Sequence, residues 1–146
     1  RGTSLPAYYF QIDAMGNLFL GGGLYAPSSD QLANARRFIA AHPQRLDALY
    51  ADPAFHAAYG AIDGEMLKRP PAGFPADAPH LDALKLKQYL VGQSYIVHEI
   101  ADDALASLII ERFSAAAPFI FWLREAVGAP AGGTTDGPDP LPIDIF

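Results

Sequence analysis

Gly21-Gly22-Gly23-Leu24-Tyr25-Ala26-Pro27 joins a strand-like segment to a helix-like segment near the start of the chain. Three consecutive glycines leave the backbone without side chains, so it can adopt positive φ angles or lie close against another group. Successive glycine N–H groups that lead to a helix N-terminus also form an anion-binding concavity in some proteins. We therefore expect the second strand to end in this run, where the bare backbone serves tight packing or anion binding.

Alternating side chains predict a β-hairpin before and within this run. From residue 7 to residue 13, one set of alternate positions is apolar, which is typical of a strand with one buried face. Residues 13–17 supply turn chemistry, with Gly16 suited to a left-handed conformation. Residues 18–20 form the returning strand, so the hairpin spans residues 7–25. A later segment, residues 89–97, predicts another strand interrupted by Gly92, and we expect it to join an antiparallel sheet.

Helical periodicity follows the glycine run and returns near the C-terminus. Ser28 and its neighbours predict a helix start, and the helix should end near His42, before Pro43. Shorter helices fit residues 44–50, 53–59 and 80–87. Asp102 opens a helix with an apolar stripe, and Pro118 starts a continuation or a second helix. The expected fold is a single α+β domain over residues 1–127, in which helices from 28–59 and 102–127 cover a small, mainly antiparallel sheet.

Two segments lack periodicity. Residues 60–80 are rich in Gly and Pro and form a long connection, which either seals one face of the sheet or contributes to function. Residues 128–146 are rich in Gly, Pro and Thr, and we expect a disordered tail.

Composition excludes several classes of protein. The net charge of −6 argues against general nucleic-acid binding, although it leaves room for a local basic patch. The longest apolar runs are too short to cross a bilayer, so we expect no membrane association. The chain has no cysteine, which excludes disulfides, thiolate metal ligands and a cysteine nucleophile. This composition suits the reducing cytoplasm.

Four blocks in register resemble the family of bacterial proteins called DUF2461, also catalogued as TIGR02453. The blocks lie within roughly residues 5–127. They are Tyr9-Phe10-Gln11-Ile12, Gly21-Gly22-Gly23-Leu24-Tyr25-x-Pro27, Leu67-Lys68-Arg69-Pro70-Pro71-x-Gly73-Phe74 and Leu84-Lys85-x-Lys87-x-Tyr89. The resemblance implies no activity, because none is established for the family. It does imply a longer family domain, with an upstream helical region carrying an Asn-Asn-Arg-x-Trp-Phe type motif. We therefore expect this chain, which starts at Arg1, to be the C-terminal part of such a domain.

Basic residues in and beside these blocks form the second candidate site. Half of the ten Lys and Arg residues fall there: Arg36, Lys68, Arg69, Lys85 and Lys87. If the fold gathers them beside Gly21, Gly22 and Gly23, they create a positive cleft for phosphate or carboxylate groups. The alternative is that they are ordinary solvated charges. Lys85 and Lys87 share a face only in an extended segment, because helical residues two apart point in different directions.

Other chemistry has weaker support. Standard nucleotide-binding glycine motifs are absent, and no Gly-x-Ser-x-Gly sequence frames a nucleophile. His42, His56, His80 and His98 lack the spacing of a metal-ligand set, so no metal and no cofactor is expected. Asp63, Glu65 and Asp77 are candidate general acids or bases, but the sequence names no catalytic residue.

Two functions from different classes follow. The first is binding of, or action on, an anionic small molecule in a cleft between the glycine run, the 60–80 connection and the basic residues. The second is a non-catalytic protein-interaction module that uses an aromatic sheet face. That face would contain Tyr8, Tyr9, Tyr25 and Phe74.

Overall fold

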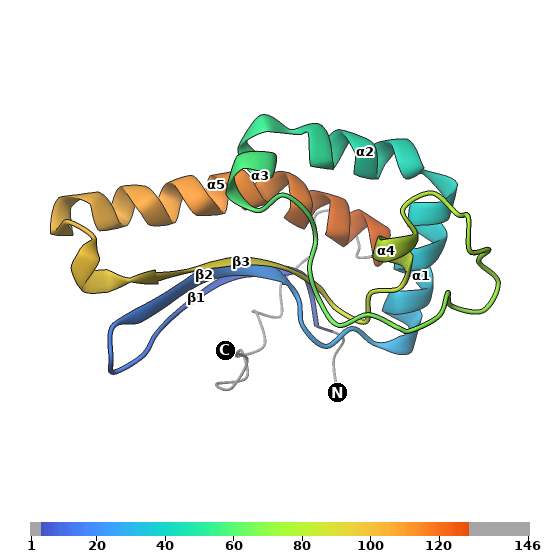
Figure 1. Cartoon of the computed structure of the whole chain (residues 1–146), viewed down its shortest axis with the longest axis horizontal. Helices are drawn as coiled ribbons and strands as arrows, with labels where there is room; N and C mark the ends of the chain where they lie inside the picture. Colours follow the sequence, from blue (N-terminus) through green and yellow to red (C-terminus); the bar gives the residue numbers. More distant parts are fainter. Residues whose placement is uncertain (1–3, 129–146) are drawn as a thin grey trace.

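The computed structural model describes residues 4–128, which form one layer of sheet and one layer of helices. In Figure 1, α2, α3, α4 and α5 lie above one face of the sheet, and α1 stands at its right-hand end. The elements are β1 (Ala7–Ile12), β2 (Asn17–Leu24), α1 (Ser29–Ala41), α2 (Pro43–Ala51), α3 (Pro53–Ala58), α4 (Leu81–Leu84), β3 (Tyr89–Ile96), the 3₁₀ turn η1 (Val97–Glu99) and α5 (Asp102–Ala126). The α+β fold class is confirmed. Residues 129–146, where we predicted a disordered tail, lie outside the described residues.

The sheet has three antiparallel strands in the order β1-β2-β3. The β1-β2 hairpin is confirmed, and its turn is fixed by Asp13, whose side chain accepts hydrogen bonds from the backbone N–H groups of Met15 and Asn17 at 2.9 Å each. Gly16 has a φ of 85°, as the turn chemistry predicts. β2 is the central strand, so it pairs along its length with a neighbour on each side.

The predicted end of the second strand was wrong. β2 continues through Gly21, Gly22 and Gly23 to Leu24, where it pairs with Tyr89. β3 likewise runs through Gly92 without interruption, and Gly92 lies opposite Gly21. Because these glycines have no side chains, they leave space in the middle of the sheet. They do not end β2 or β3.

Helix α1 begins where the sequence predicts it. The Ser28 hydroxyl accepts a hydrogen bond from the N–H of Gln31 at 3.1 Å, and the Gln31 side chain accepts one from the N–H of Ser28 at 2.9 Å. This capping box satisfies two N–H groups that a helix start leaves unpaired. The Gln31 amide also donates to the carbonyl of Ser4 at 2.7 Å, so it joins α1 to the segment before β1. The helix end at His42 and the helices α2 and α3 are confirmed as well.

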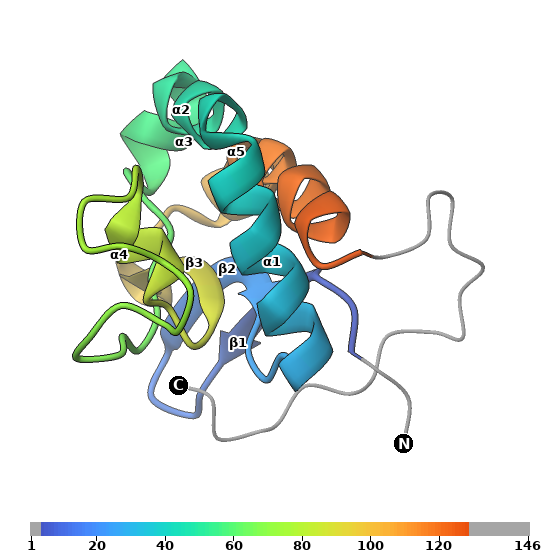
Figure 2. The same cartoon turned by 90° about the vertical axis from the view of Figure 1, so that its right-hand side faces the viewer.

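Helix α5 crosses the helix-covered face of the sheet and contacts β2 most (Figure 2). Its C-terminal half supplies Phe119, Ile120, Trp122 and Leu123 to the core. The helix passes through Pro118 as a single element of 25 residues. Proline removes the hydrogen bond to the carbonyl four residues earlier, but that carbonyl belongs to Ser114, which is exposed and open to water.

By length and composition, α5 is apolar enough to cross a membrane, because joining the segments on both sides of Pro118 gives a longer apolar run than we expected. Core helices of globular proteins pass the same test. Within α5, however, only 22% of the apolar window is buried. The N-terminal half of the helix therefore carries apolar side chains that the described fold leaves accessible.

The 60–80 connection is joined to the segment before β3 by a short antiparallel ladder. Leu67 N–H donates to the Lys85 carbonyl at 2.8 Å, and Lys87 N–H donates to the Glu65 carbonyl at 2.7 Å. We call residues 65–69 and 85–87 the cationic ladder. The predicted helix over residues 80–87 is therefore correct only for α4 and its C-cap Lys85, because the chain pairs with the 60–80 connection from Leu86 onward.

Candidate functional site

A hollow of about 430 Å³ lies between α2, α4 and the 60–80 connection, and we call it the His80 pocket. Its lining residues are Tyr50, Ala61, Ile62, Met66, His80, Leu81, Asp82 and Ala83. The wall is apolar except for Tyr50, His80 and Asp82. A mostly apolar concavity with a few polar groups is the usual form of a small-molecule site.

His80 and Asp47 form a hydrogen bond beside this pocket. The Nε2 atom of His80 lies 2.7 Å from Oδ1 of Asp47. The exposed fraction is 18% for the His80 side chain and 67% for the Asp47 side chain, so the imidazole is sheltered while the carboxylate contacts water. Because a carboxylate can only accept, Nε2 carries a proton and donates it to Asp47. In neutral histidine this leaves the lone pair on Nδ1, which has no hydrogen-bond partner among the described residues.

The backbone of His80 is held in an unusual conformation. Its φ is 55° and its ψ is 41°, and it is the one non-glycine residue in the described part of the chain with positive φ. This left-handed region is sterically unfavourable for residues with a Cβ. Such a conformation persists where the surroundings determine it, and it is enriched at ligand sites. Here His80 immediately precedes α4, so its conformation sets the direction in which the imidazole leaves the chain.

Tyr50 packs against the imidazole from α2. The rings of Tyr50 and His80 meet edge to face with centroids 5.9 Å apart, and Tyr50 stacks on Phe55 at 6.2 Å. Burial raises the pKa of the Tyr50 hydroxyl above its usual value, the hydrogen bond from the Ile62 N–H opposes this, and the nearby Asp82 carboxylate raises it further. Tyr50 is therefore a neutral phenol near neutral pH. It orients the histidine and offers a hydroxyl to the pocket.

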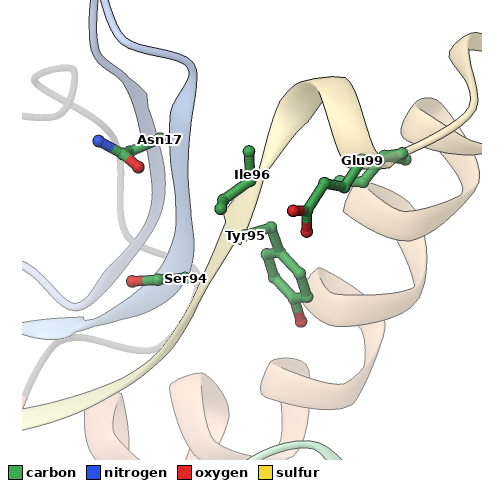
Figure 3. Close-up of a pocket in the computed structure, with 6 residues that line it drawn as sticks. Asn17, Ser94, Tyr95, Ile96 and Glu99 are labelled. Carbon is green, nitrogen blue, oxygen red and sulfur yellow. The ribbon is translucent and has the colours of Figure 1, made fainter.

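A second hollow of similar volume has a less suitable arrangement. It lies where β2 and β3 approach η1 and is lined by Asn17, Ser94, Tyr95, Ile96, Glu99 and Ile100. Figure 3 shows that Asn17 and Ser94 point to one side of the sheet, whereas the Tyr95 ring points to the other side, toward α5. Its polar groups do not converge on one point. The His80 pocket is therefore the better candidate.

The glycine run contributes to neither hollow. Gly21, Gly22 and Gly23 are buried within β2, and their partners in β3 are Gly92, Val91 and Leu90. Backbone N–H groups of successive strand residues point in opposite directions, toward the two neighbouring strands. They do not form the curved row of donors that we expected at a strand-to-helix junction, because the strand does not end there.

The basic residues are partly gathered. In the cationic ladder Lys85 keeps helical dihedrals at the end of α4 (φ −82°, ψ −11°), so the extended segment in which it would share a face with Lys87 is not formed. Lys68 and Arg69 follow Leu67 on the opposite segment. Lys68, Arg69 and Lys87 are exposed.

Arg36 has a different role. Its guanidinium donates to the carbonyls of Leu84 and Leu86 at 3.0 and 3.2 Å, and thereby fastens α1 to the ladder. None of the eight predicted ligand-binding residues lines either described hollow.

A family model matches residues 1–122, and its description is "Conserved hypothetical protein (DUF2461)". The match covers most of the chain, including the glycine run, the cationic ladder and His80. The chain belongs to the DUF2461 family. No curated protein and no solved structure shows a significant match to this DUF2461 protein.

The predicted acids do not gather with His80. Asp63 pairs with Leu90 through the backbone, and its carboxylate accepts a hydrogen bond from the N–H of Gly64 at 2.8 Å. Glu65 and Asp77 are exposed, and neither lines the His80 pocket. Within residues 4–128, no group of three or more His, Cys, Asp or Glu side chains is arranged to hold a metal ion.

Sequence reasoning missed the His80–Asp47 pair in this DUF2461 protein. The two residues are 33 positions apart and belong to no recognised motif. We considered His80 only as a metal ligand, and its left-handed backbone has no signature in a single sequence. Polar residues that flank a predicted helix after a long connection weakly indicate a site near α4. Nothing in this pattern indicates that Asp47 lies close to it.

Proposed function

We propose that the His80 pocket binds a small molecule and that His80 exchanges a proton with it. The observation that carries this proposal is the 2.7 Å contact between His80 Nε2 and Asp47 beside a hollow of about 430 Å³. A carboxylate that accepts from one ring nitrogen fixes the tautomer and makes the other nitrogen a base. Asp47 thus positions the imidazole, and Nδ1 of His80 is the atom that accepts or returns the proton.

The lining of the pocket restricts the ligand. Ile62, Met66 and Leu81 offer apolar contact, while Asp82 brings a second carboxylate close to His80 and Tyr50. A carboxylate favours hydroxyl or ammonium groups and disfavours an anion at the same place. The preferred ligand therefore has a small apolar body and a hydroxyl or amine that faces His80.

Binding is testable by a thermal-shift screen of the full chain against small alcohols, amines, sugars and nucleosides. Compounds that bind the pocket raise the melting temperature of the wild type, and His80→Asn removes that increase. His56→Asn is the matched control, because His56 is exposed on α3 and does not line the pocket. Hits that stabilise the wild type and His80→Asn equally would refute binding at the pocket.

Proton exchange is testable with a hit from that screen. Nuclear magnetic resonance of the imidazole reports the tautomer and the protonation state of His80, with and without the compound. We expect the compound to change the protonation equilibrium of His80 in the wild type. In Asp47→Asn we expect binding with an altered tautomer, because an amide can present either a donor or an acceptor to Nε2. An imidazole signal indifferent to the ligand would overturn the proton-exchange role while leaving the binding site in place.

We propose an anion-binding role for the cationic ladder as the second candidate. It is supported by the backbone pairing of residues 65–67 with residues 85–87, which brings Lys85 and Lys87 near Lys68 and Arg69. Glu65 lies opposite Lys87 and weakens the local positive field. Stabilisation by inorganic phosphate or a phosphorylated metabolite should be lost in Lys85→Gln/Lys87→Gln and retained in His80→Asn. The reverse pattern would assign the anion to the pocket.

The proposed compartment is the cytoplasm, on the support of a cysteine-free composition. Cell fractionation with an antibody to the chain tests this location.

A further inference from the structure

β1 is an edge strand whose outward backbone groups can be identified. Asp13 N–H donates to the Asn17 carbonyl at 3.0 Å, so this pair belongs to the hydrogen-bonded set of the hairpin. Hydrogen-bonded and non-hydrogen-bonded pairs alternate along an antiparallel ladder. The backbone groups of Tyr8, Phe10 and Ile12 therefore point away from β2. Within the part of the chain that the structure describes, these outward groups have no partner.

The same three residues present apolar side chains on one face. The exposed fractions are 37% for Tyr8, 55% for Phe10 and 50% for Ile12. The strand Ala7–Ile12 contains no proline and no charged residue. Proteins normally protect exposed edge strands with lysine, proline or a bulge, because a bare edge pairs with other strands. β1 has none of these protections.

The flank of α5 extends this apolar surface. Phe113 contacts Tyr8 with ring centroids 5.4 Å apart, so this side of α5 faces β1. Ile110 and Phe121 lie within about 80° of Phe113 around the helix axis. Their exposed fractions are 67% and 68%. The edge of the sheet and the side of the helix above it thus form one apolar surface.

We propose that two copies of this chain pair through β1 in antiparallel orientation, across a two-fold axis at Phe10. This register pairs Phe10 with Phe10 of the second copy, and Tyr8 with Ile12 of the second copy. Each pair exchanges two N–H···O bonds, which gives about six backbone hydrogen bonds. The product is a continuous six-stranded sheet with both α5 helices on the same face. The side chains of Tyr8, Phe10 and Ile12 then cover their counterparts between the two helices.

Charge favours a second copy over an unrelated strand. Arg124 donates to the Pro6 carbonyl at 3.2 and 3.3 Å from its two nitrogens, which places a cation at the start of β1. Asp13 places an anion just after the end of β1. In the register centred on Phe10, Pro6 of one copy lies opposite residue 14 of the other. Each Arg124 therefore approaches Asp13 of the second copy, twice across the axis, while the centre of the interface is uncharged.

Sedimentation equilibrium of the full chain tests the assembly. At tens of micromolar the wild type should have twice the monomer mass of 15.6 kDa. Phe10→Lys should have the monomer mass, because the axis would bring two ammonium groups together. Ile96→Lys is the matched control: Ile96 is an apolar residue with an exposed fraction of 39% on the opposite edge strand, β3. A wild-type monomer, or a dimer broken by Ile96→Lys and not by Phe10→Lys, would overturn the proposal.

Cross-linking tests the register without relying on loss of assembly. The chain has no cysteine, so any disulfide in a single-cysteine variant joins two copies. Residues paired at the axis have α-carbons about 5.5 Å apart, which is within disulfide reach. Phe10→Cys should form a covalent dimer on mild oxidation, and Ile96→Cys should remain monomeric in the same gel. Equal cross-linking of the two variants, or none in Phe10→Cys, argues against the pairing.

Discussion

The ring of Phe19 lies directly against the α-carbon of Gly92 on the neighbouring strand. A Cβ on Gly92 would lie 2.6 Å from Cε2 of Phe19 and closer still to Cζ, and a Cβ on Gly21 would lie 2.8 Å from Cε1. The facing glycines Gly21 and Gly92 thus create a depression in the sheet that the ring fills. Tyr9 stacks on Phe19 at 6.1 Å and completes this packing on the face of the sheet away from α5.

Gly92→Ala should destabilise the protein by about 1–3 kcal/mol, because the new methyl group overlaps a ring in a packed layer. Phe19→Ala should relieve part of that cost, so the double variant is more stable than the sum of the single effects predicts. Urea denaturation of the four proteins measures the coupling. Gly60→Ala is the control: apart from Gly60 and its chain neighbours, no described atom lies within 4 Å of the new Cβ, so its cost comes from the positive φ of 80° and should add to that of Phe19→Ala. An additive result for Gly92 would contradict the steric explanation.

Substitution of Arg36 should destabilise the protein much more than substitution of Arg37, although the two residues are adjacent in the sequence. Arg36→Ala leaves the carbonyls of Leu84 and Leu86 without their guanidinium donor, which costs about 1–3 kcal/mol. Arg37 is exposed and contacts the side chain of Asn34 within α1, so Arg37→Ala should change the free energy of unfolding by less than about 0.5 kcal/mol. Chemical denaturation compares the two variants directly. Equal costs would show that the guanidinium of Arg36 does not hold the ladder.

The left-handed backbone of His80 predicts an order of stability among substitutions at this position. Asparagine tolerates that conformation, whereas a β-branched residue is strained there. His80→Val should therefore be less stable than His80→Asn by about 1–3 kcal/mol. Thermal unfolding measures the difference, and His56→Val against His56→Asn in helix α3 provides the comparison without left-handed strain. If the two His80 variants were equally stable, the backbone strain would be absent in solution.

The raised pKa of the Tyr89 hydroxyl predicts a loss of stability at high pH. Burial raises the pKa of its hydroxyl from 10.0 to about 12, and Arg36 opposes this shift. A group whose pKa is higher in the folded state stabilises the protein fully below the unfolded pKa. The free energy of unfolding should therefore fall as the pH rises from about 10 to about 12. Urea titrations at pH 7, 10, 11 and 12 should show a shallower fall in Tyr89→Phe.

The free energy of unfolding of Tyr89→Phe should still fall in this pH range, because burial also raises the pKa of Tyr9 and of Tyr59 to about 12. At pH 7, Tyr89→Phe should be as stable as the wild type or more stable by about 1 kcal/mol, because its buried hydroxyl has no hydrogen-bond partner among the described residues. A large loss of stability at pH 7 would show that the hydroxyl has a partner in solution. An unchanged slope between pH 10 and pH 12 would contradict the assigned shift.

The amino-acid sequence by itself determined the local structure. The helix start at Ser28, the Asp13 turn and the apolar periodicity of α5 depend on residues a few positions apart, and each lies where the pattern predicted it. Periodicity also gave the fold class, because it shows which faces must be buried. Strand ends were less predictable. Glycine weakens a strand in isolation, and the sequence does not show that Phe19 fills the space that the glycines leave.

The tertiary structure alone decided the candidate site. His80 and Asp47 meet only because α2 and the end of the 60–80 connection pack together, and Arg36 became a structural donor only because α1 packs against the ladder. We expected the glycine run to be a possible anion site, but it lies at the centre of the sheet because β3 pairs with it on the side opposite β1. Contacts between distant residues depend on how apolar faces pack, which involves many weak interactions at once. The spacing of apolar residues along the chain indicates which face of each helix or strand is buried, but it does not indicate which of these faces pack against each other.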